Sequence, residues 1–309
     1  MIINVGNRTD IPAFYSKWFY HRIAEGFVYV RNPYNYHDVT HYDLDPKVVD
    51  LLFFCTKNPQ PMLSDISLID SFDQYWYVTI TGYDKDIEPF VPPFESVLHS
   101  FYQLSHTLGS HRVGWRYDPI IITDKYDMPY HLAQFERIAR SLVTYTEVCV
   151  ISFVDLYNKT VKNMPGIREV TPEQQLECAA AMVEIAAQYG MTIKTCAEPL
   201  ASLDSLALNR DGCFIQKDWE AMTGKKYKIP KKPSKREHCQ CLLENEIGVY
   251  NSCPHGCLYC YANYSRGLVL NSYKKHDPFS PLLIGHREPG DRIRKSKQMS
   301  YIDEQLGLF

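Results

Sequence analysis

The sequence predicts an α/β fold made of repeated βα units around a mainly parallel sheet or barrel. Short runs rich in β-branched and aromatic residues alternate with longer segments whose apolar residues recur at helical spacing. Of the 309 residues, 45% are hydrophobic and 22% are charged, which excludes disordered, collagen-like and coiled-coil chains. At this length one large α/β domain or two small domains are equally compatible with the sequence.

Seven segments are expected to form strands, because each is a short apolar run bounded by polar or turn-forming residues. They are residues 2–6, 49–55, 75–81, 112–117, 147–153, 191–196 and 247–250. No internal sequence repeat is visible.

Four segments between these strands are expected to be helices, at residues 12–25, 96–108, 132–142 and 171–190. Pro12 suits a first helical turn, and Gly26 and Gly109 follow the last apolar positions of the first two helices. Thr171, followed by Pro172, is expected to cap the fourth helix.

The chain is expected to be cytoplasmic and to have no membrane contact. Its first ten residues have no basic region or apolar run, and no stretch reaches the ~18 consecutive apolar residues of a spanning helix. In that compartment the ten cysteines are not expected to form disulfides. Seven of them lie between residues 196 and 260, and this clustering indicates metal binding.

The charge of the whole chain does not select a partner, because the formal net charge is only −3. Two basic segments, residues 223–237 and 287–297, could still form a local surface for a phosphate backbone. The first has seven Lys or Arg, two prolines and no apolar period. We interpret it as a solvated linker or flap, with contact to nucleic acid as the alternative.

Polar and charged residues follow six of the predicted strands. The loops after parallel strands converge on one face of a barrel, where active sites lie. A single such residue is more often a helix cap or an ion-pair partner, but the shared pattern favours a polar pocket. The candidate catalytic residues, with no role assigned to any of them, are Arg8, Asp10, Lys57, Arg116, Asp118 and Glu198.

Three cysteines follow the last predicted strand in a C-x3-C-x2-C arrangement: Cys253, Cys257 and Cys260. Thiolates are the usual ligands of iron–sulfur clusters, and three of them leave one iron of a [4Fe–4S] cluster open to another ligand. Zinc is the alternative. It usually takes four protein ligands in a structural site, so it would need His255 or a distant cysteine.

The cysteine spacing, with Tyr259 before the third cysteine, resembles the cluster loop of the radical SAM superfamily. The resemblance implies a [4Fe–4S] cluster whose open iron is chelated by S-adenosylmethionine, which is reductively cleaved to a 5′-deoxyadenosyl radical. It also implies that Tyr259 lies against the adenine and that a reductant such as flavodoxin or ferredoxin supplies the electron.

A second resemblance covers nearly the whole chain. The segments NRTDIPAFYSKWF, CTKNPQPM, WRYDPII, ISFVDLY and CPHGCLYCYAN resemble the family DUF1848, whose C-terminal cysteines are similar to the radical SAM loop. This family brings no known reaction with it.

The order of the motifs departs from that of the radical SAM superfamily. Its cysteine loop normally follows the first strand of the barrel, and a Gly-Gly-Glu-Pro segment normally holds the methionyl amino group; that segment is absent here. A circular permutation, in which residues 247–250 pair in parallel with residues 2–6, would explain the first difference. Asn7, Arg8 and Asp10 would then lie near the methionyl end of the cofactor, with Arg8 close to the open iron and paired with the carboxylate.

The expected fold is therefore a radical SAM-like partial (β/α) barrel of the TIM type, circularly permuted, with its cluster loop near the C-terminus. Residues 1–222 form the barrel body, residues 223–237 the basic linker or flap, and residues 238–309 a cysteine-rich segment and tail that complete the barrel.

Four more cysteines lie near the cluster motif: Cys196, Cys213, Cys239 and Cys241. Four thiolates match an auxiliary iron–sulfur cluster or a structural zinc site. The alternative is that Cys196 and Cys213 are ordinary packed thiols.

We expect a radical SAM enzyme whose substrate is unknown, with nucleic-acid repair or modification favoured by the basic segments. The alternative is a non-catalytic iron–sulfur redox protein or DNA-associated binding protein. Residues 305–309, Gln-Leu-Gly-Leu-Phe, resemble the peptide by which many bacterial DNA-repair proteins bind the sliding clamp. Packing of Leu308 and Phe309 back onto the barrel is the other interpretation of this tail.

Overall fold

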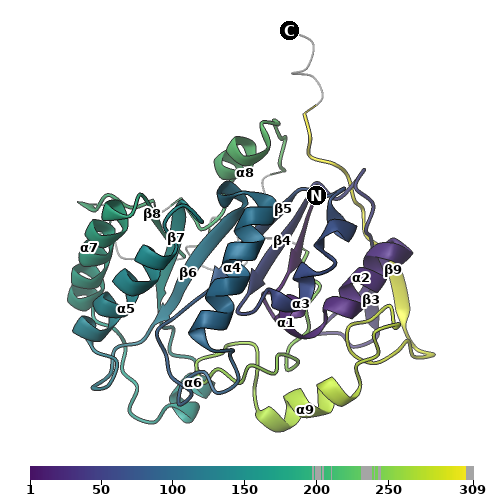
Figure 1. The fold of residues 1–309 in the computed structure, drawn as a ribbon. Coiled ribbons are helices and arrows are strands. Elements are labelled where there is room, and N and C mark those ends of the chain that lie inside the picture. The colour runs from purple at the N-terminus through teal and green to yellow at the C-terminus, as the bar shows by residue number, and fades with distance from the viewer. Residues whose placement is uncertain are drawn as a thin grey trace.

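The central feature of the molecule is a six-stranded parallel sheet with the order β1-β4-β5-β6-β7-β8 (Figure 1). The computed structural model describes residues 1–196, 198, 203, 205–209, 211–230, 239, 241–242 and 245–303. The strands are β1 (Ile2–Val5), β4 (Leu51–Thr56), β5 (Gln74–Thr79), β6 (Val113–Ile120), β7 (Val148–Phe153) and β8 (Thr192–Thr195). These strands confirm the predicted α/β class and lie within a few residues of the predicted segments.

Helices connect the strands and cover the face of the sheet that is toward the viewer in Figure 1, where α4, α5 and α7 lie in front of it. Thr171 caps α7 with a capping box, and Gly26 ends α2 in a left-handed conformation at φ 76°, as predicted. The predicted first helix is divided at Tyr15 into two helices. The helices are α1 (Ile11–Phe14), α2 (Ser16–Glu25), α3 (Gln60–Leu63), α4 (Phe94–Leu108), α5 (Met128–Ser141), α6 (Asn158–Asn163), α7 (Pro172–Gln188), α8 (Gln216–Thr223) and α9 (Arg266–Lys274), with 3-10 turns η1 (Ile66–Ile69) and η2 (Ser110–Arg112).

A second sheet of three strands was not predicted from the sequence. It contains β2 (Phe27–Arg31), β3 (Asp38–Asp43) and β9 (Arg292–Lys295); β3 pairs antiparallel with β2 and parallel with β9. Strand β9 lies within the basic segment at residues 287–297. Its Arg292 and Lys295 form ion pairs with acidic side chains of β3, at 2.9 and 2.8 Å.

Parallel pairing beside β1 is found, but at residues 245–247 instead of along the predicted residues 247–250, which do not form a strand. A parallel bridge joins Glu246 to Asn4. The Asn4 N–H donates to the carbonyl of Asn245 at 3.2 Å, and the Ile247 N–H donates to the carbonyl of Asn4 at 3.1 Å. No further backbone bond between β1 and this segment follows in the described residues, and the Gly248 N–H donates to the Glu246 side chain at 2.7 Å. Within the described residues the sheet does not close into a barrel.

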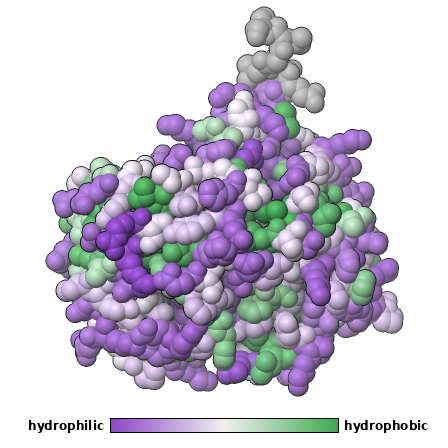
Figure 2. Space-filling view, in the orientation of Figure 1, coloured by the Kyte–Doolittle hydropathy of each residue, from purple (hydrophilic) through white to green (hydrophobic). Residues whose placement is uncertain are grey.

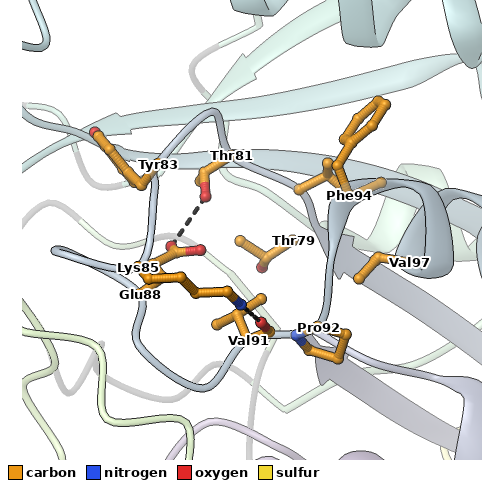
Figure 3. Close-up of a pocket in the computed structure, with 10 residues that line it drawn as sticks. Thr79, Thr81, Tyr83, Lys85, Glu88, Val91, Pro92, Phe94 and Val97 are labelled. Atoms are coloured by element: carbon orange, nitrogen blue, oxygen red, sulfur yellow. Dashed lines mark hydrogen bonds between the residues drawn. The ribbon is translucent and has the colours of Figure 1, made fainter.

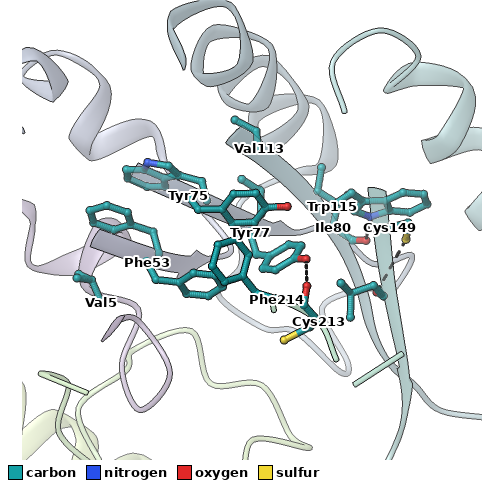
Figure 4. Packing of buried hydrophobic residues seen from close by; sticks show 14 of the residues in the cluster. Val5, Phe53, Tyr75, Tyr77, Ile80, Val113, Trp115, Cys149, Cys213 and Phe214 are labelled. Carbon is teal, nitrogen blue, oxygen red and sulfur yellow. Dashed lines mark hydrogen bonds between the residues drawn. The ribbon is translucent and has the colours of Figure 1, made fainter. Parts of the chain in front are cut away.

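Aromatic side chains fill the core beneath the centre of the sheet (Figure 4). Phe214 lies against Tyr75 and Phe53, with ring centroids 4.7 and 5.0 Å apart. The Tyr77 hydroxyl donates to the carbonyl of Cys213, so the segment carrying Cys213 and Phe214 is fixed to the strands by packing and by a buried hydrogen bond. This attachment fixes the position of Cys213, one of the predicted metal ligands, beneath β5.

The face of the molecule shown in Figure 2 is mainly hydrophilic, with hydrophobic patches between the polar side chains. Among the helices that the structure describes, none has both the length and the apolar character needed to cross a membrane.

Candidate functional site

The loop with Cys253, Cys257 and Cys260 lies across the carboxyl ends of the parallel strands. Three contacts hold it there. The His255 ring bonds the Asp10 carboxylate after β1 at 2.8 Å, the Leu258 N–H donates to the carbonyl of Ile87 after β5 at 3.1 Å, and the Phe90 N–H donates to the carbonyl of His255 at 3.1 Å. Loops at this edge of a parallel sheet form the active sites of α/β enzymes.

Asp10 is the carboxylate that joins this loop to the sheet. It is 7% exposed, and its oxygens accept four hydrogen bonds: from the N–H groups of Ala13 (3.1 Å) and Lys57 (2.7 Å), the Thr56 hydroxyl (2.7 Å) and His255 (2.8 Å). Because both oxygens are occupied, Asp10 acts here as a positioning residue for the cysteine loop.

Glu88 is the corresponding carboxylate at the other end of the loop. It is 4% exposed and accepts from Lys57 Nζ at 2.8 Å, from the Thr81 hydroxyl at 2.9 Å and from the Tyr259 hydroxyl. Burial alone would lower the pKa of Lys57, but Glu88 and the nearby Cys257 give a net raised pKa. Sequence reasoning missed Glu88, which lies nine residues beyond the end of β5 without a motif of its own.

A small pocket lies beside Glu88 (Figure 3). Its volume is about 60 Å³, and its polar wall includes Thr79, Thr81 and Lys85. Pockets for drug-sized ligands measure roughly 300–1,000 Å³. In the conformation described, this pocket is therefore too small for the adenosyl group of S-adenosylmethionine.

The three predicted iron ligands lie together in the loop and are partly buried. Burial raises the pKa of the Cys253 and Cys257 thiols, and the charge of Cys260 raises both further. The backbone around them is tied by a bond from Asn263 Nδ2 to the carbonyl of Cys253 at 2.8 Å.

The chemistry of this donor set fits an iron–sulfur cluster, because three cysteines occur within eight consecutive residues. As the side chains lie, no group of three or more His, Cys, Asp or Glu in the described part of the chain is already arranged around a metal position. Cluster binding would require these thiols to turn toward a common point.

The predicted cofactor-binding residues Asn7 and Arg8 lie beside the start of the loop. The Arg8 guanidinium is 4.8 Å from the centre of the Tyr250 ring, and the Tyr261 hydroxyl donates to the carbonyl of Asn7 at 2.7 Å. The Asn7 N–H donates to Glu246 at 3.1 Å. Desolvation raises the pKa of Glu246 to about 7.

The other candidates lie further along the same edge. Arg116 Nε donates to Asp118 at 3.1 Å, and this pair lies at the end of β6. Glu198, beyond β8, accepts from the Phe153 N–H at 2.9 Å, and burial raises its pKa to about 7. The strand-end residues thus form one group around the cysteine loop and another around β6 and β8.

The second set of cysteines lies with this other group. The sulfurs of Cys213 and Cys241 are 2.8 Å apart, and Cys196 directly follows β8. Cys239 contacts Cys241. The structure therefore places Cys213 beside Cys241, and Cys196 and Cys239 lie within interaction distance of this pair.

The described lysines of the predicted flap bind carboxylates of the chain itself. The bonded pairs, at 2.7 to 2.9 Å, are Lys225 with Asp73, Lys226 with Glu220, and Lys228 with Asp303. The rest of the flap, residues 231–237, and the clamp-like tail, residues 305–309, lie outside the described residues.

Comparison with known families gives one match over most of the chain. The model of the family described as Domain of unknown function (DUF1848) matches residues 2–262. No curated protein matches the chain.

Proposed function

The chain belongs to the DUF1848 family, and we propose that it is an enzyme that binds a [4Fe–4S] cluster through Cys253, Cys257 and Cys260 and cleaves S-adenosylmethionine reductively. The observation that carries this proposal is the parallel pairing of residues 245–247 with β1. The cysteine loop then follows the first strand position in space, although it comes late in the chain.

The topology supports a permuted partial barrel. In space the order is residues 245–247, β1, β4, β5, β6, β7 and β8, with helices between successive strands. Radical SAM domains resemble this arrangement, with a cysteine loop after the first strand of an open (β/α) barrel. We propose that fold here, with the chain ends moved to a different point of the same sheet.

The residues around the loop are proposed to orient and protect the centre. A bound cluster of this kind supplies one electron to the sulfonium, which gives methionine and a 5′-deoxyadenosyl radical that removes a hydrogen atom from the substrate. Asp10 and His255 fix the loop on β1 and β4, while Glu88 fixes Tyr259. The positive charge of Lys57 acts on the nearby Cys257 and favours the thiolate form of Cys257, which metal binding needs.

Arg8 and Asn7 are proposed to bind the methionyl end of S-adenosylmethionine. Both follow β1 directly, next to the segment that enters the cysteine loop. A guanidinium can hold a carboxylate through two parallel hydrogen bonds. Tyr259 is proposed to contact the adenine, which requires it to leave Glu88 or to present its ring face.

Anaerobic reconstitution tests the proposal. The wild-type protein, loaded with iron and sulfide and supplied with S-adenosylmethionine and dithionite, should form 5′-deoxyadenosine, measured by liquid chromatography and mass spectrometry. Each of C253A, C257A and C260A should lose both the product and the cluster that forms it. C178A, which removes a buried helix cysteine outside both groups, is the matched control and should retain activity.

Two results would contradict the proposal. Stoichiometric zinc without iron at Cys253, Cys257 and Cys260 would show that the loop is a zinc site. A full cluster with no 5′-deoxyadenosine under any reductant, including reduced flavodoxin or ferredoxin, would favour the non-catalytic iron–sulfur alternative.

For the substrate we propose nucleic acid, on the charge of residues 231–237. A variant with Lys231, Lys232, Lys235 and Arg236 changed to alanine should elute from a DNA column at lower salt than the wild type. K226A, which breaks an ion pair with Glu220, should elute like the wild type. Equal elution of all three proteins would remove this part of the proposal. Deletion of residues 305–309 tests clamp binding in the same way, with purified clamp as the probe.

A further inference from the structure

Four cysteines from three separate segments lie near one another at the carboxyl edge of the sheet, apart from the loop of the proposed cluster. Cys213 Sγ lies 2.8 Å from Cys241 Sγ, and the Cys213 N–H donates to Cys241 Sγ at 3.1 Å. Cys196 lies within interaction distance of Cys213 and Cys241, and Cys239 lies within interaction distance of Cys241. Each sulfur therefore has at least one sulfur neighbour.

The spacing of these sulfurs is informative. A disulfide has an S–S length of about 2.0 Å, well below the 2.8 Å between Cys213 and Cys241. Around a tetrahedral zinc ion with Zn–S bonds of about 2.3 Å, two sulfurs are about 3.8 Å apart. Cys213 and Cys241 are therefore not joined by a disulfide, although their sulfurs are in close contact. If the two sulfurs moved about 1 Å further apart, a zinc ion would fit between them.

The fold itself brings the four thiols together. Cys213 is 1% exposed and is anchored by Tyr77 and by Phe214 in the aromatic core (Figure 4). The Leu242 N–H donates to the carbonyl of Phe214 at 3.0 Å, which places Cys241 beside Cys213.

Cys196 reaches the same place because a second parallel bridge holds the segment before Cys213 at the outer edge of β8. This bridge pairs Lys194 with Asn209, and the Thr195 N–H donates to the carbonyl of Asn209 at 3.1 Å. The convergence of the four cysteines thus depends on backbone pairing at two places.

A buried cation lies close to two of the thiols. Arg116 is 9% exposed, its Nε donates to Asp118 at 3.1 Å, and its charge also acts on Cys196 and Cys213. Four thiolates around a divalent ion carry a net charge of −2, and N–H···S bonds from an arginine offset part of it.

We propose that Cys196, Cys213, Cys239 and Cys241 bind a second metal centre, of the four-thiolate type that takes zinc or an iron–sulfur cluster. Both are soft-metal centres with a closed set of four cysteine ligands. The centre is separate from the loop of Cys253 and does not depend on the proposed function.

The experiment uses the full-length triple variant C253A/C257A/C260A, purified without air, so that any metal it holds belongs to the second site. Elemental analysis should find about one zinc, or about two to four iron with matching sulfide, per chain. Adding C239A and C241A should reduce the metal at least tenfold. Adding C178A instead should leave the metal unchanged.

A second measurement covers the case in which the five-fold variant does not fold. In the triple variant, Cys239 and Cys241 should resist alkylation by iodoacetamide until a strong chelator is added, as read by peptide mass spectrometry. Zinc in the triple variant identifies a structural site, and iron with sulfide identifies an auxiliary cluster; both support the proposal.

Three results would overturn it: a triple variant without stoichiometric metal, metal that stays when Cys239 and Cys241 are replaced, or a Cys213–Cys241 disulfide in protein purified without air. Failure to form 5′-deoxyadenosine in the wild type would leave these readouts unaffected.

Discussion

Replacing Asp10 tests whether one buried carboxylate holds the cysteine loop on the sheet. In D10A, four donors lose their acceptor: the N–H groups of Ala13 and Lys57, the Thr56 hydroxyl and His255. D10N keeps one carbonyl oxygen but turns an amide NH₂ toward two of these donors. Both changes act at the point where β1, β4, α1 and the loop meet.

The cost follows from counting donors. A buried donor without a partner costs about 1–3 kcal/mol, and loss of a helix cap costs about 1 kcal/mol. The Thr56 hydroxyl can rotate to another acceptor, so we count in full only Lys57 N–H, His255 and the cap at Ala13. D10A should then lower the free energy of unfolding by about 3–7 kcal/mol, and D10N by about 1–3 kcal/mol. At ~2–4 °C per kcal/mol, the Tm of D10A should fall by roughly ten degrees.

The assay is thermal and urea unfolding of the metal-free protein, with hydrogen exchange read by mass spectrometry. Both variants should exchange faster at Leu258 and Phe90, whose N–H groups bond across the loop. D124A, which removes an exposed carboxylate, is the control and should stay within about 0.5 kcal/mol of the wild type. If D10A unfolds within 1 kcal/mol of the wild type and exchange over the loop is unchanged, Asp10 does not hold the loop and the argument fails.

Three further predictions concern stability. G6A should lower the free energy of unfolding by at least about 3 kcal/mol, because Gly6 has φ +143° and an added Cβ would meet a carbonyl oxygen of β4 at 2.2 Å. G26A is the control: its Cβ meets open space at φ +76°, so it should cost only about 1–2 kcal/mol, and equal melting temperatures of the two variants would refute the steric argument. Desolvation raises the pKa of Glu246 to about 7, so the folded protein keeps a proton that the unfolded chain releases near pH 4.5. The free energy of unfolding should therefore fall by about 3 kcal/mol as the pH rises from about 4.5 to 7. E246Q should flatten this pH dependence, and stability curves of E246Q and the wild type that run parallel would contradict the argument. K57M leaves Glu88 buried without its cation and should lower the free energy of unfolding in urea by roughly 2–4 kcal/mol. The double variant K57M/E88Q should recover part of this loss, and a double variant no more stable than K57M would argue against a direct Lys57–Glu88 pair.

The main sheet could be predicted because its strands are buried on both faces, so their sequences are continuous apolar runs such as Leu51–Thr56. The second sheet could not. Its strand Arg292–Lys295 consists mainly of charged residues and has no apolar run that would indicate a strand. Those charges are satisfied by Asp38 and Asp43, about 250 residues earlier in the chain, and no local pattern shows such pairing.

The candidate site, like the fold, could be predicted from the sequence only in part. The cysteines of both groups could be selected from spacing and clustering alone, because ligand motifs are local. The partner of Lys57 could not, since Glu88 lies in an irregular loop after β5 and meets Lys57 only in the folded protein. Asp10 was selected as a pocket residue from its place after β1, but its four donors, and hence its positioning role, depend on three-dimensional contacts.

The pairing of residues 245–247 with β1 also bears on how the chain folds during synthesis. One edge of β1 has its partner β4 within about the first sixth of the chain, but the other edge waits for a segment some 240 residues later. At roughly 5–20 residues per second, a ribosome needs on the order of ten to fifty seconds to deliver it. During that interval an apolar strand edge is open to pairing with another chain, which is the usual route to aggregation. A cell that makes this protein therefore needs either slow collapse of the first half of the chain or a chaperone that covers β1 until the cysteine segment emerges.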